Sequence, residues 1–165
     1  MHDPEPFVPK VPGIDYGILD SLLGYAVRRA QIQLYEDFIP SLAPWGITPP
    51  RFSAMVIVSR NPGLKLTQLA RIMGIARSGS VSLVDALEDL GYMQRLPMPG
   101  DRRAFGLALT EKGQASLAAI SAAVQAHDER MAQMLSPDER TQLRRLLTRM
   151  SEGPAVASAS TAAGR

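Results

Sequence analysis

The sequence predicts a mainly α-helical protein with one small β-hairpin. Two observations predict this fold class. Apolar residues recur three or four positions apart, the spacing of a helix face, over most of residues 14–150. Between residues 92 and 109 the pattern changes to two short runs around a turn that contains Pro99-Gly100-Asp101, and the second run alternates as a strand does. We therefore expect long helices on both sides of a hairpin.

The first long helix is predicted over residues 14–39. Its apolar residues from Leu19 to Phe38 follow one stripe. Pro40 and Pro44 are expected to end it, because a proline inside a helix lacks the N–H donor and clashes with the preceding turn. Residues 1–13 carry four prolines and are predicted to form an extended arm.

Three shorter helices are predicted next, each with its own start or stop signal. Thr48 is a plausible N-cap with Pro49 at the first helical position. Gly74 ends the second helix, and Gly91 ends the third in a manner typical of a left-handed C-terminal cap. The predicted ranges are 49–59, 66–73 and 77–90.

The hairpin and two further helices complete the predicted elements. The strands are expected over residues 92–96 and 105–109, with a tight loop over 97–103 and a basic tip. Thr110 then caps a long helix that reaches about Leu135. Ser136-Pro-Asp-Glu139 is a capping box that starts the last helix. Residues 151–165 are small and polar, and we expect them to be disordered.

Composition excludes several classes of function. The 165 residues include no cysteine, which removes disulfides, thiolate metal sites and cysteine nucleophiles. The uncharged apolar runs, such as residues 52–59, are far shorter than the ~20 residues that span a bilayer. The N-terminus lacks the basic and apolar segments of a signal peptide, so a cytoplasmic location without membrane association is expected.

The distribution of charge indicates an anionic partner. The net charge is only +2, but residues 49–110 contain eight basic and four acidic residues, a net charge of +4, so the remainder carries −2. A basic middle segment between mildly acidic flanks is typical of a surface that binds a polyanion such as DNA. Chance clustering of arginines is the alternative, and charge alone does not decide between them.

The order of the elements indicates a winged helix-turn-helix. Two short helices joined by a tight turn precede a basic hairpin, and in such folds the second helix enters the major groove of DNA. On that helix, 77–90, the inward side is apolar and the outward side carries serines, Gly79, Asp85 and Asp89. Serine hydroxyls can contact phosphates or base edges, and a helix N-terminus favours phosphate. The candidate contacts are Arg77, Ser78, Ser80 and Ser82.

Three segments of the sequence resemble the MarR family of transcriptional regulators. They are LKLTQLARIMG from residue 64, RSGSVSLVDALEDLG from residue 77 and DRRAFGLALTEKG from residue 101. The third is the most specific, because it combines Asp-x-Arg at the wing tip with an alternating strand, Leu-Thr and a glycine three residues after the threonine. The resemblance covers about residues 19–150.

The resemblance implies a homodimer that binds a palindromic operator and a small-molecule effector, without a cofactor. It divides the chain into the arm 1–13, an N-terminal dimerisation and ligand region 14–48, a DNA-binding lobe 49–110, C-terminal dimerisation helices 111–150 and the tail 151–165. One departure from the family lies at Ala86, where many members carry a basic residue. We expect Asp85 and Asp89 to pair with nearby arginines.

The wing is the clearest candidate site that the resemblance implies. Arg103 would reach into a narrow A·T-rich minor groove, where negative potential is concentrated. Asp101 would hold Arg103 extended through a charge-assisted hydrogen bond. Arg102 and Arg95 would contact phosphates. An ordinary exposed ion pair on a turn is the alternative interpretation.

A pocket for the effector is expected between the first helices and the DNA-binding lobe. Aromatic and arginine side chains there would suit an aromatic carboxylate or its CoA thioester. The candidates are Tyr16, Tyr25, Arg28, Arg29, Trp45 and Phe52. Alternatively, Tyr25 and Trp45 are core residues, and the two arginines pair with Glu36, Asp37 or the partner subunit.

The sequence does not indicate an enzyme or a metal site. His2 lies in the proline-rich arm, and His127 is interpreted as a surface residue on a long helix, because its acidic neighbours in sequence point in other directions. Neither a nucleophile with its base nor a glycine-rich phosphate loop is recognised. We expect a ligand-responsive transcriptional repressor. The alternative is a winged-helix module that binds proteins and does not read DNA.

Overall fold

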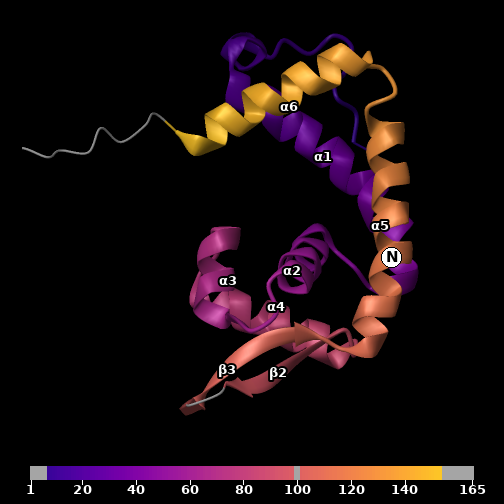
Figure 1. The fold of residues 1–165 in the computed structure, drawn as a ribbon. Coiled ribbons are helices and arrows are strands. Elements are labelled where there is room, and N and C mark those ends of the chain that lie inside the picture. The colour runs from indigo at the N-terminus through magenta and orange to yellow at the C-terminus, as the bar shows by residue number, and fades with distance from the viewer. Residues whose placement is uncertain (1–6, 99–100, 154–165) are drawn as a thin grey trace, which may run out of the picture. The chain divides into compact units, whose positions relative to one another are not determined.

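The computed structural model describes residues 7–98 and 101–153, except the side chains of 101–104, and it confirms the predicted fold class (Figure 1). Its elements are a 3₁₀ helix Gly17–Ser21, α1 Leu23–Leu42, a 3₁₀ helix Ala43–Trp45, α2 Pro49–Arg60, β1 Leu64–Lys65, α3 Leu66–Met73, α4 Arg77–Asp89, β2 Met93–Met98, β3 Asp101–Leu109, α5 Glu111–Met131 and α6 Pro137–Glu152. None of the described helices is long and apolar enough to cross a bilayer. The chain divides into two compact units between His127 and Asp128, inside α5.

The first predicted helix differs from the observed one at both ends. A 3₁₀ helix precedes α1, and the α-helix begins only at Leu23. The prediction that Pro40 ends the helix is wrong, because Pro40 lies inside α1 and the helix continues to Leu42. Leu42 is fully buried, as is most of Phe38 one turn earlier. Burial of this pair favours another helical turn despite the hydrogen bond that proline cannot donate.

The core of the first unit is built from α1, α2, α3, α4, the sheet and α5. In Figure 1, α2, α3 and α4 gather beside β2 and β3. The buried side chains are mainly aliphatic, with Tyr92 and two methionines among them. They are Phe38, Leu42, Ile47, Ala54, Met55, Val58, Leu69, Val84, Leu87, Tyr92, Met93, Leu107, Leu109 and Ile120. This core fixes the two helices of the helix-turn-helix against the sheet.

The sheet has three strands, one more than predicted. The strand order is β1-β3-β2, with both pairs antiparallel, so β3 lies in the centre. β1 joins β3 where Gly63 and Gly106 meet: a Cβ on Gly106 would lie 2.8 Å from the Gly63 Cα. β2 and β3 are also longer than predicted, because residues 97–98 and 101–103 of the expected loop belong to the strands; residues 99–100 lie outside the described residues.

Gly113 and Thr110 explain in physical terms the Leu-Thr-x-x-Gly pattern at the start of α5. The Thr110 hydroxyl donates to the Gly91 carbonyl at 2.6 Å and accepts from the Gly113 N–H at 2.9 Å, so Thr110 acts as the predicted N-cap. Lys112 donates to the Leu90 carbonyl at 2.7 Å. The end of α4 is therefore tied directly to the first turn of α5. The Lys112 cation also complements the negative, C-terminal end of the α4 dipole.

The predicted left-handed cap after α4 and the predicted capping box of α6 are both present. Gly91 has a φ of 73°. The Ser136 N–H donates to the Glu139 carboxylate at 2.8 Å, and the Glu139 N–H donates to the Ser136 hydroxyl at 3.3 Å. At Thr48 the position is that of an N-cap, but the side chain makes no capping hydrogen bond.

The capping box makes the stability of α6 depend on pH. The backbone hydrogen bond from Ser136 lowers the pKa of Glu139 below its ordinary value of 4.5. A carboxyl whose pKa is lower in the folded state stabilises it above its unfolded pKa, and the contribution is lost as pH falls through the folded pKa. We expect Glu139→Gln to lower the melting temperature at about pH 7 and to leave it unchanged at about pH 2. Thermal melts followed by circular dichroism measure this; an equal difference at both pH values would contradict it.

Candidate nucleic-acid interface

The first half of α4 presents an exposed, partly basic surface. Arg77, Ser78, Gly79 and Ser82 are all exposed, and for Ser78, Gly79 and Ser82 the helix pattern predicts this. The Ser82 hydroxyl donates a hydrogen bond to the Ser78 carbonyl of the same helix at 3.3 Å. Gly79 has open space where a Cβ would lie. A partner can therefore approach the N-terminal turns of α4 closely.

Ser80 corrects the expectation for the serines of this helix. Its side chain is fully buried, and its hydroxyl donates to the Arg77 carbonyl at 2.7 Å. Ser80 lies one turn before Val84 and two turns before Leu87, which are also fully buried, so it belongs to the inward face of α4. Its hydroxyl is satisfied internally and is not part of the exposed surface.

A cationic hollow of about 290 Å³ lies beside the start of α4. Its polar lining comes from Lys65 and Thr67 at the start of α3, Arg77 at the start of α4 and Arg95 on β2. Lys65 and Thr67 are not among the candidate residues predicted from the sequence. The available signal was their position, since Lys65-Leu-Thr67 directly precedes and begins a short helix whose first N–H groups have no partner within the helix.

Arg95 is held by two carboxylates of α4. Its guanidinium donates to Asp85 at 2.7 Å and forms a second ion pair with Glu88. The hydrogen bond to Asp85, together with the charge of Glu88, raises the pKa of Arg95 above its already high ordinary value. The expectation that Asp85 pairs with an arginine is confirmed. Arg95 itself is engaged within the protein, and the phosphate contact assigned to it from the sequence stays a prediction.

The wing residues lie at the start of β3. The backbone of Asp101, Arg102 and Arg103 belongs to this strand, and Asp101 pairs with Met98 across a register shift after Pro97. Their side chains lie outside the described part of the structure. The contacts assigned to these three residues from the sequence therefore stay predictions.

The candidate effector residues separate into three places. Tyr16, Tyr25 and Arg29 form one cluster, in which the guanidinium lies 5.6 Å from the Tyr16 ring centre and 5.4 Å from that of Tyr25. The rings lie 6.4 Å apart. Trp45 and Phe52 instead pack against the core, as the alternative interpretation for Trp45 had it. The cluster therefore combines aromatic surface with a positive charge at the start of α1.

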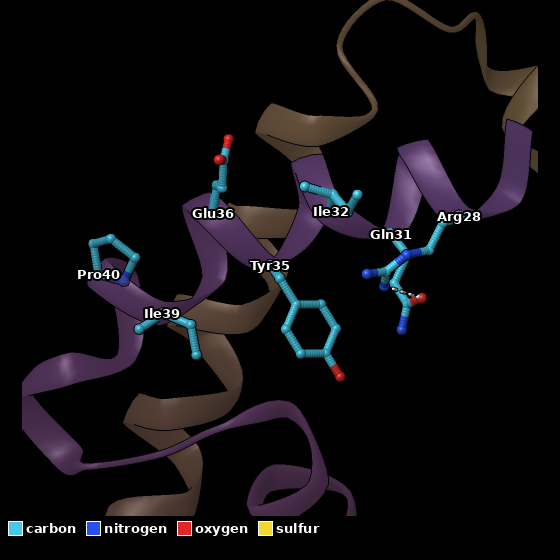
Figure 2. Close-up of a pocket in the computed structure, with 7 residues that line it drawn as sticks. All are labelled: Arg28, Gln31, Ile32, Tyr35, Glu36, Ile39 and Pro40. Carbon is cyan, nitrogen blue, oxygen red and sulfur yellow. Dashed lines mark hydrogen bonds between the residues drawn. The ribbon is translucent and has the colours of Figure 1, made fainter. Parts of the chain in front are cut away.

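Arg28 contributes to a separate groove along α1. The groove has a volume of about 540 Å³, and all of its lining residues come from this helix. Figure 2 shows Arg28 beside Gln31, with the Tyr35 ring extending from the same stretch of α1. The Arg28 guanidinium donates to the Gln31 side chain at 3.5 Å. The lining residues are Arg28, Gln31, Ile32, Tyr35, Glu36, Ile39 and Pro40.

The described part of the N-terminal arm contacts this same region of its own chain. The Phe7 N–H donates to the Glu36 carboxylate at 2.8 Å, and Lys10 forms an ion pair with Asp20 at 3.2 Å. The Val11 N–H donates to the Tyr16 hydroxyl at 3.1 Å. Residues 7–11 therefore touch both the groove and the tyrosine–arginine cluster.

His127 is buried, so its interpretation as a surface residue is wrong. Its Nδ1 lies 2.7 Å from the Asp37 carboxylate, and its ring meets Phe38 edge-on at 5.2 Å. The pair could not be predicted from local sequence, because Asp37 lies on α1 and His127 lies on α5. Among the described residues, no three His, Cys, Asp or Glu side chains gather as a metal site would require.

Known proteins resemble the chain over both the fold and the proposed DNA-contacting segment. The model of the MarR family matches residues 47–105, from before α2 into β3. A relative from Thauera aromatica, described as a transcriptional regulatory protein for the hcr operon, is 35% identical over 145 residues, covering 85% of this chain and 87% of the relative. The chain belongs to the MarR family. MarR-family proteins are DNA-binding transcription regulators and not enzymes, in agreement with the sequence analysis.

Two solved MarR-family structures are similar over nearly their whole length. One is the transcriptional repressor CouR bound to a 23-mer DNA duplex, 39% identical with a TM-score of 0.79, covering 84% of this chain and 98% of CouR. The other is CouR bound to p-coumaroyl-CoA, 36% identical with a TM-score of 0.79, covering 86% and 99%. The winged helix fold predicted from the sequence is thus confirmed.

Proposed function

We propose that this chain is a repressor that binds a palindromic operator as a homodimer and leaves it when an aromatic acid or aromatic acyl-CoA binds. The observation that carries the proposal is the exposed first half of α4 beside a hollow lined by Lys65, Thr67 and Arg77. A helix start with basic side chains is the arrangement that accepts a DNA phosphate while the helix enters the major groove. The DNA complex of CouR supports this assignment.

The readout of bases is assigned to the start of α4 and to the wing. Arg77, Ser78 and Ser82 face the major groove, while Lys65 and Thr67 hold the adjacent phosphates. The wing adds minor-groove contacts by Arg103, which Asp101 holds extended, and a phosphate contact by Arg102. The second half of α4 carries Asp85, Glu88 and Asp89 and contributes little attraction to DNA.

The effector contact is assigned first to the cluster of Tyr16, Tyr25 and Arg29. Stacking on the tyrosine rings suits an aromatic group, and the Arg29 guanidinium suits a carboxylate or phosphate. Arg28 lies in the separate groove along α1, where it would contact only a ligand long enough to reach from the cluster. The complex of CouR with p-coumaroyl-CoA supports this class of ligand. The effector acts by population shift: it favours dimers whose two recognition helices do not match the operator spacing.

Titration of the purified protein against the promoter fragment beside its own gene tests the proposal. We expect tight binding that weakens steeply with salt, because phosphate contacts release counterions. Arg103→Ala should weaken operator binding by about tenfold or more, the worth of one good base contact. Arg149→Ala, which removes a charge from α6 outside the family-matched segment, is the control and should bind as the wild type does.

The effector is tested on the same complex. p-Coumaroyl-CoA should release the operator, whereas free CoA, which lacks the aromatic acyl group, should not. Equal affinity for the promoter fragment and for random DNA of the same length would overturn the DNA-binding proposal. Operator binding that no aromatic acid or acyl-CoA weakens would overturn only the effector.

A further inference from the structure

Arg95 joins the recognition helix to the wing hairpin. It lies on β2, opposite Leu107 of β3, while both of its carboxylate partners lie on α4. Asp85 and Glu88 are three residues apart, so they share one face of the helix. The planar guanidinium fork can bind two carboxylates at once in a fixed orientation, which a lysine ammonium cannot. One side chain therefore adds a polar link between α4 and the hairpin, beyond the buried core that already packs the two against each other.

The exposure of this cluster indicates a geometric role in place of a large contribution to stability. The side chains of Arg95, Asp85 and Glu88 are 32%, 51% and 28% exposed. Ion pairs with this much solvent access add little to the free energy of unfolding. Such ion pairs do restrict the arginine side chain and the strand that carries it. Here the Arg95 cluster restricts the angle between α4 and the hairpin, the two elements that contact DNA in the proposed function.

The angle between α4 and the hairpin affects DNA affinity, because both elements bind the same duplex in the proposed function. When one element has bound, the second binds at an effective concentration that depends on how well its position is fixed. The C-terminal end of α4 is also tied to α5, because Thr110 and Lys112 donate to the carbonyls of Gly91 and Leu90 directly after the helix. The Arg95 cluster restrains the hairpin, whose far end carries residues 101–103.

We propose that Arg95 is a positioning residue, which holds the wing at the angle to α4 that a specific operator requires and does not itself contact phosphate. This inference rests on the proposed DNA-binding function. It assigns Asp85 and Glu88 the same role, although their charge alone would repel DNA. The acidic second half of the recognition helix is thereby explained as the anchor of the wing.

A double variant distinguishes a phosphate contact from a positioning role, because the two predict different effects on operator preference. Asp85→Asn with Glu88→Gln removes two negative charges and leaves Arg95 in place. If Arg95 is a phosphate contact, the freed arginine and the higher net charge should tighten binding to all DNA. If Arg95 positions the wing, the double variant should lose preference for the operator over a random duplex, by about tenfold.

Further variants complete the experiment. Adding Arg95→Leu to the double variant should change the operator preference no further, because the cluster is already broken. For a phosphate contact, this third substitution would instead weaken binding to every duplex and lower the salt slope by about 0.9. Asp89→Asn, an exposed acid on the same helix, is the matched control; it should keep the wild-type operator preference. Melting temperatures show whether each variant is folded.

Amide hydrogen exchange of the hairpin tests the inference without DNA. The double variant should exchange the amides of β2 and β3 faster than the wild type and the Asp89→Asn control do. Unchanged exchange in the hairpin, or an operator preference that the double variant retains, would overturn the positioning role. If the double variant exchanges faster but the wild type shows no operator preference, the proposed function is overturned and the restraint on the hairpin is still established.

Discussion

Gly113→Ala is expected to destabilise the protein by about 3 kcal/mol or more, toward the upper end of overpacking effects. Gly113 is buried in the first turn of α5, where a Cβ would lie 2.0 Å from the Tyr92 carbonyl oxygen and 2.9 Å from its carbonyl carbon. The clash is with backbone, so no change of rotamer relieves it. The segment after α4 and the start of α5 would have to separate.

The same substitution should also weaken the contacts around it. Tyr92 accepts a hydrogen bond from the Thr110 N–H at 3.1 Å, and Thr110 binds the Gly91 carbonyl. These hydrogen bonds depend on the close approach that Gly113 permits. Denaturant unfolding followed by circular dichroism gives the free energy of unfolding for wild type and variant.

Gly79→Ala is the matched control for this measurement. Gly79 is also helical, but open space surrounds the position of its Cβ. Alanine has the higher helix propensity, so this variant should be as stable as the wild type or more stable by up to about 1 kcal/mol. If Gly113→Ala unfolded at the same denaturant concentration as Gly79→Ala, the close approach to Tyr92 would not be a requirement of the fold.

Leu107→Ala is expected to destabilise the protein by about 2–5 kcal/mol, the range for deleting a large buried aliphatic side chain. Leu107 is 1% exposed and lies on the central strand, opposite Leu64 on one side and Arg95 on the other. A cavity there can be filled only if both neighbouring strands move. The measurement is again the free energy of unfolding from a denaturant titration.

Phe105→Ala provides the comparison on the same strand. Phe105 is two residues from Leu107 and on the same face of the sheet, but it is 49% exposed because the core ends before the hairpin tip. The loss of this larger side chain should therefore cost only about 1 kcal/mol. An equal or larger cost for Phe105→Ala would show that the core extends further along the hairpin than the buried side chains indicate.

Local signals were sufficient for most of the helices and for the exposed half of the site. α3 occupies the predicted range 66–73, and α6 begins at the predicted capping box. Ser78 and Ser82 are exposed as their spacing on the helix predicts, and Arg77 is exposed at the N-terminal end of the helix. Ser80 was misplaced because a serine on the inward face can satisfy its hydroxyl on the backbone, which removes the cost that normally keeps it exposed.

Pairings between residues far apart in the sequence were not predicted. β1 has only two residues, and its partner β3 lies about forty positions later. The His127–Asp37 pair joins residues 90 positions apart. In both cases the neighbouring residues in the sequence carry no signal for the pairing. The strand and the His127–Asp37 pair form only because folding brings the two partners together.

The sequence by itself determined the class of the protein, the order of its elements and the exposed start of the recognition helix. These follow from spacing, capping residues and glycines, which act within a few residues along the chain. Only the tertiary structure decided that Arg95 is engaged by Asp85 and Glu88, that His127 is buried, and that Tyr16, Tyr25 and Arg29 meet while Trp45 joins the core. The physical reason is that burial and charge pairing depend on distance in space, and that distance is established only when distant segments pack together.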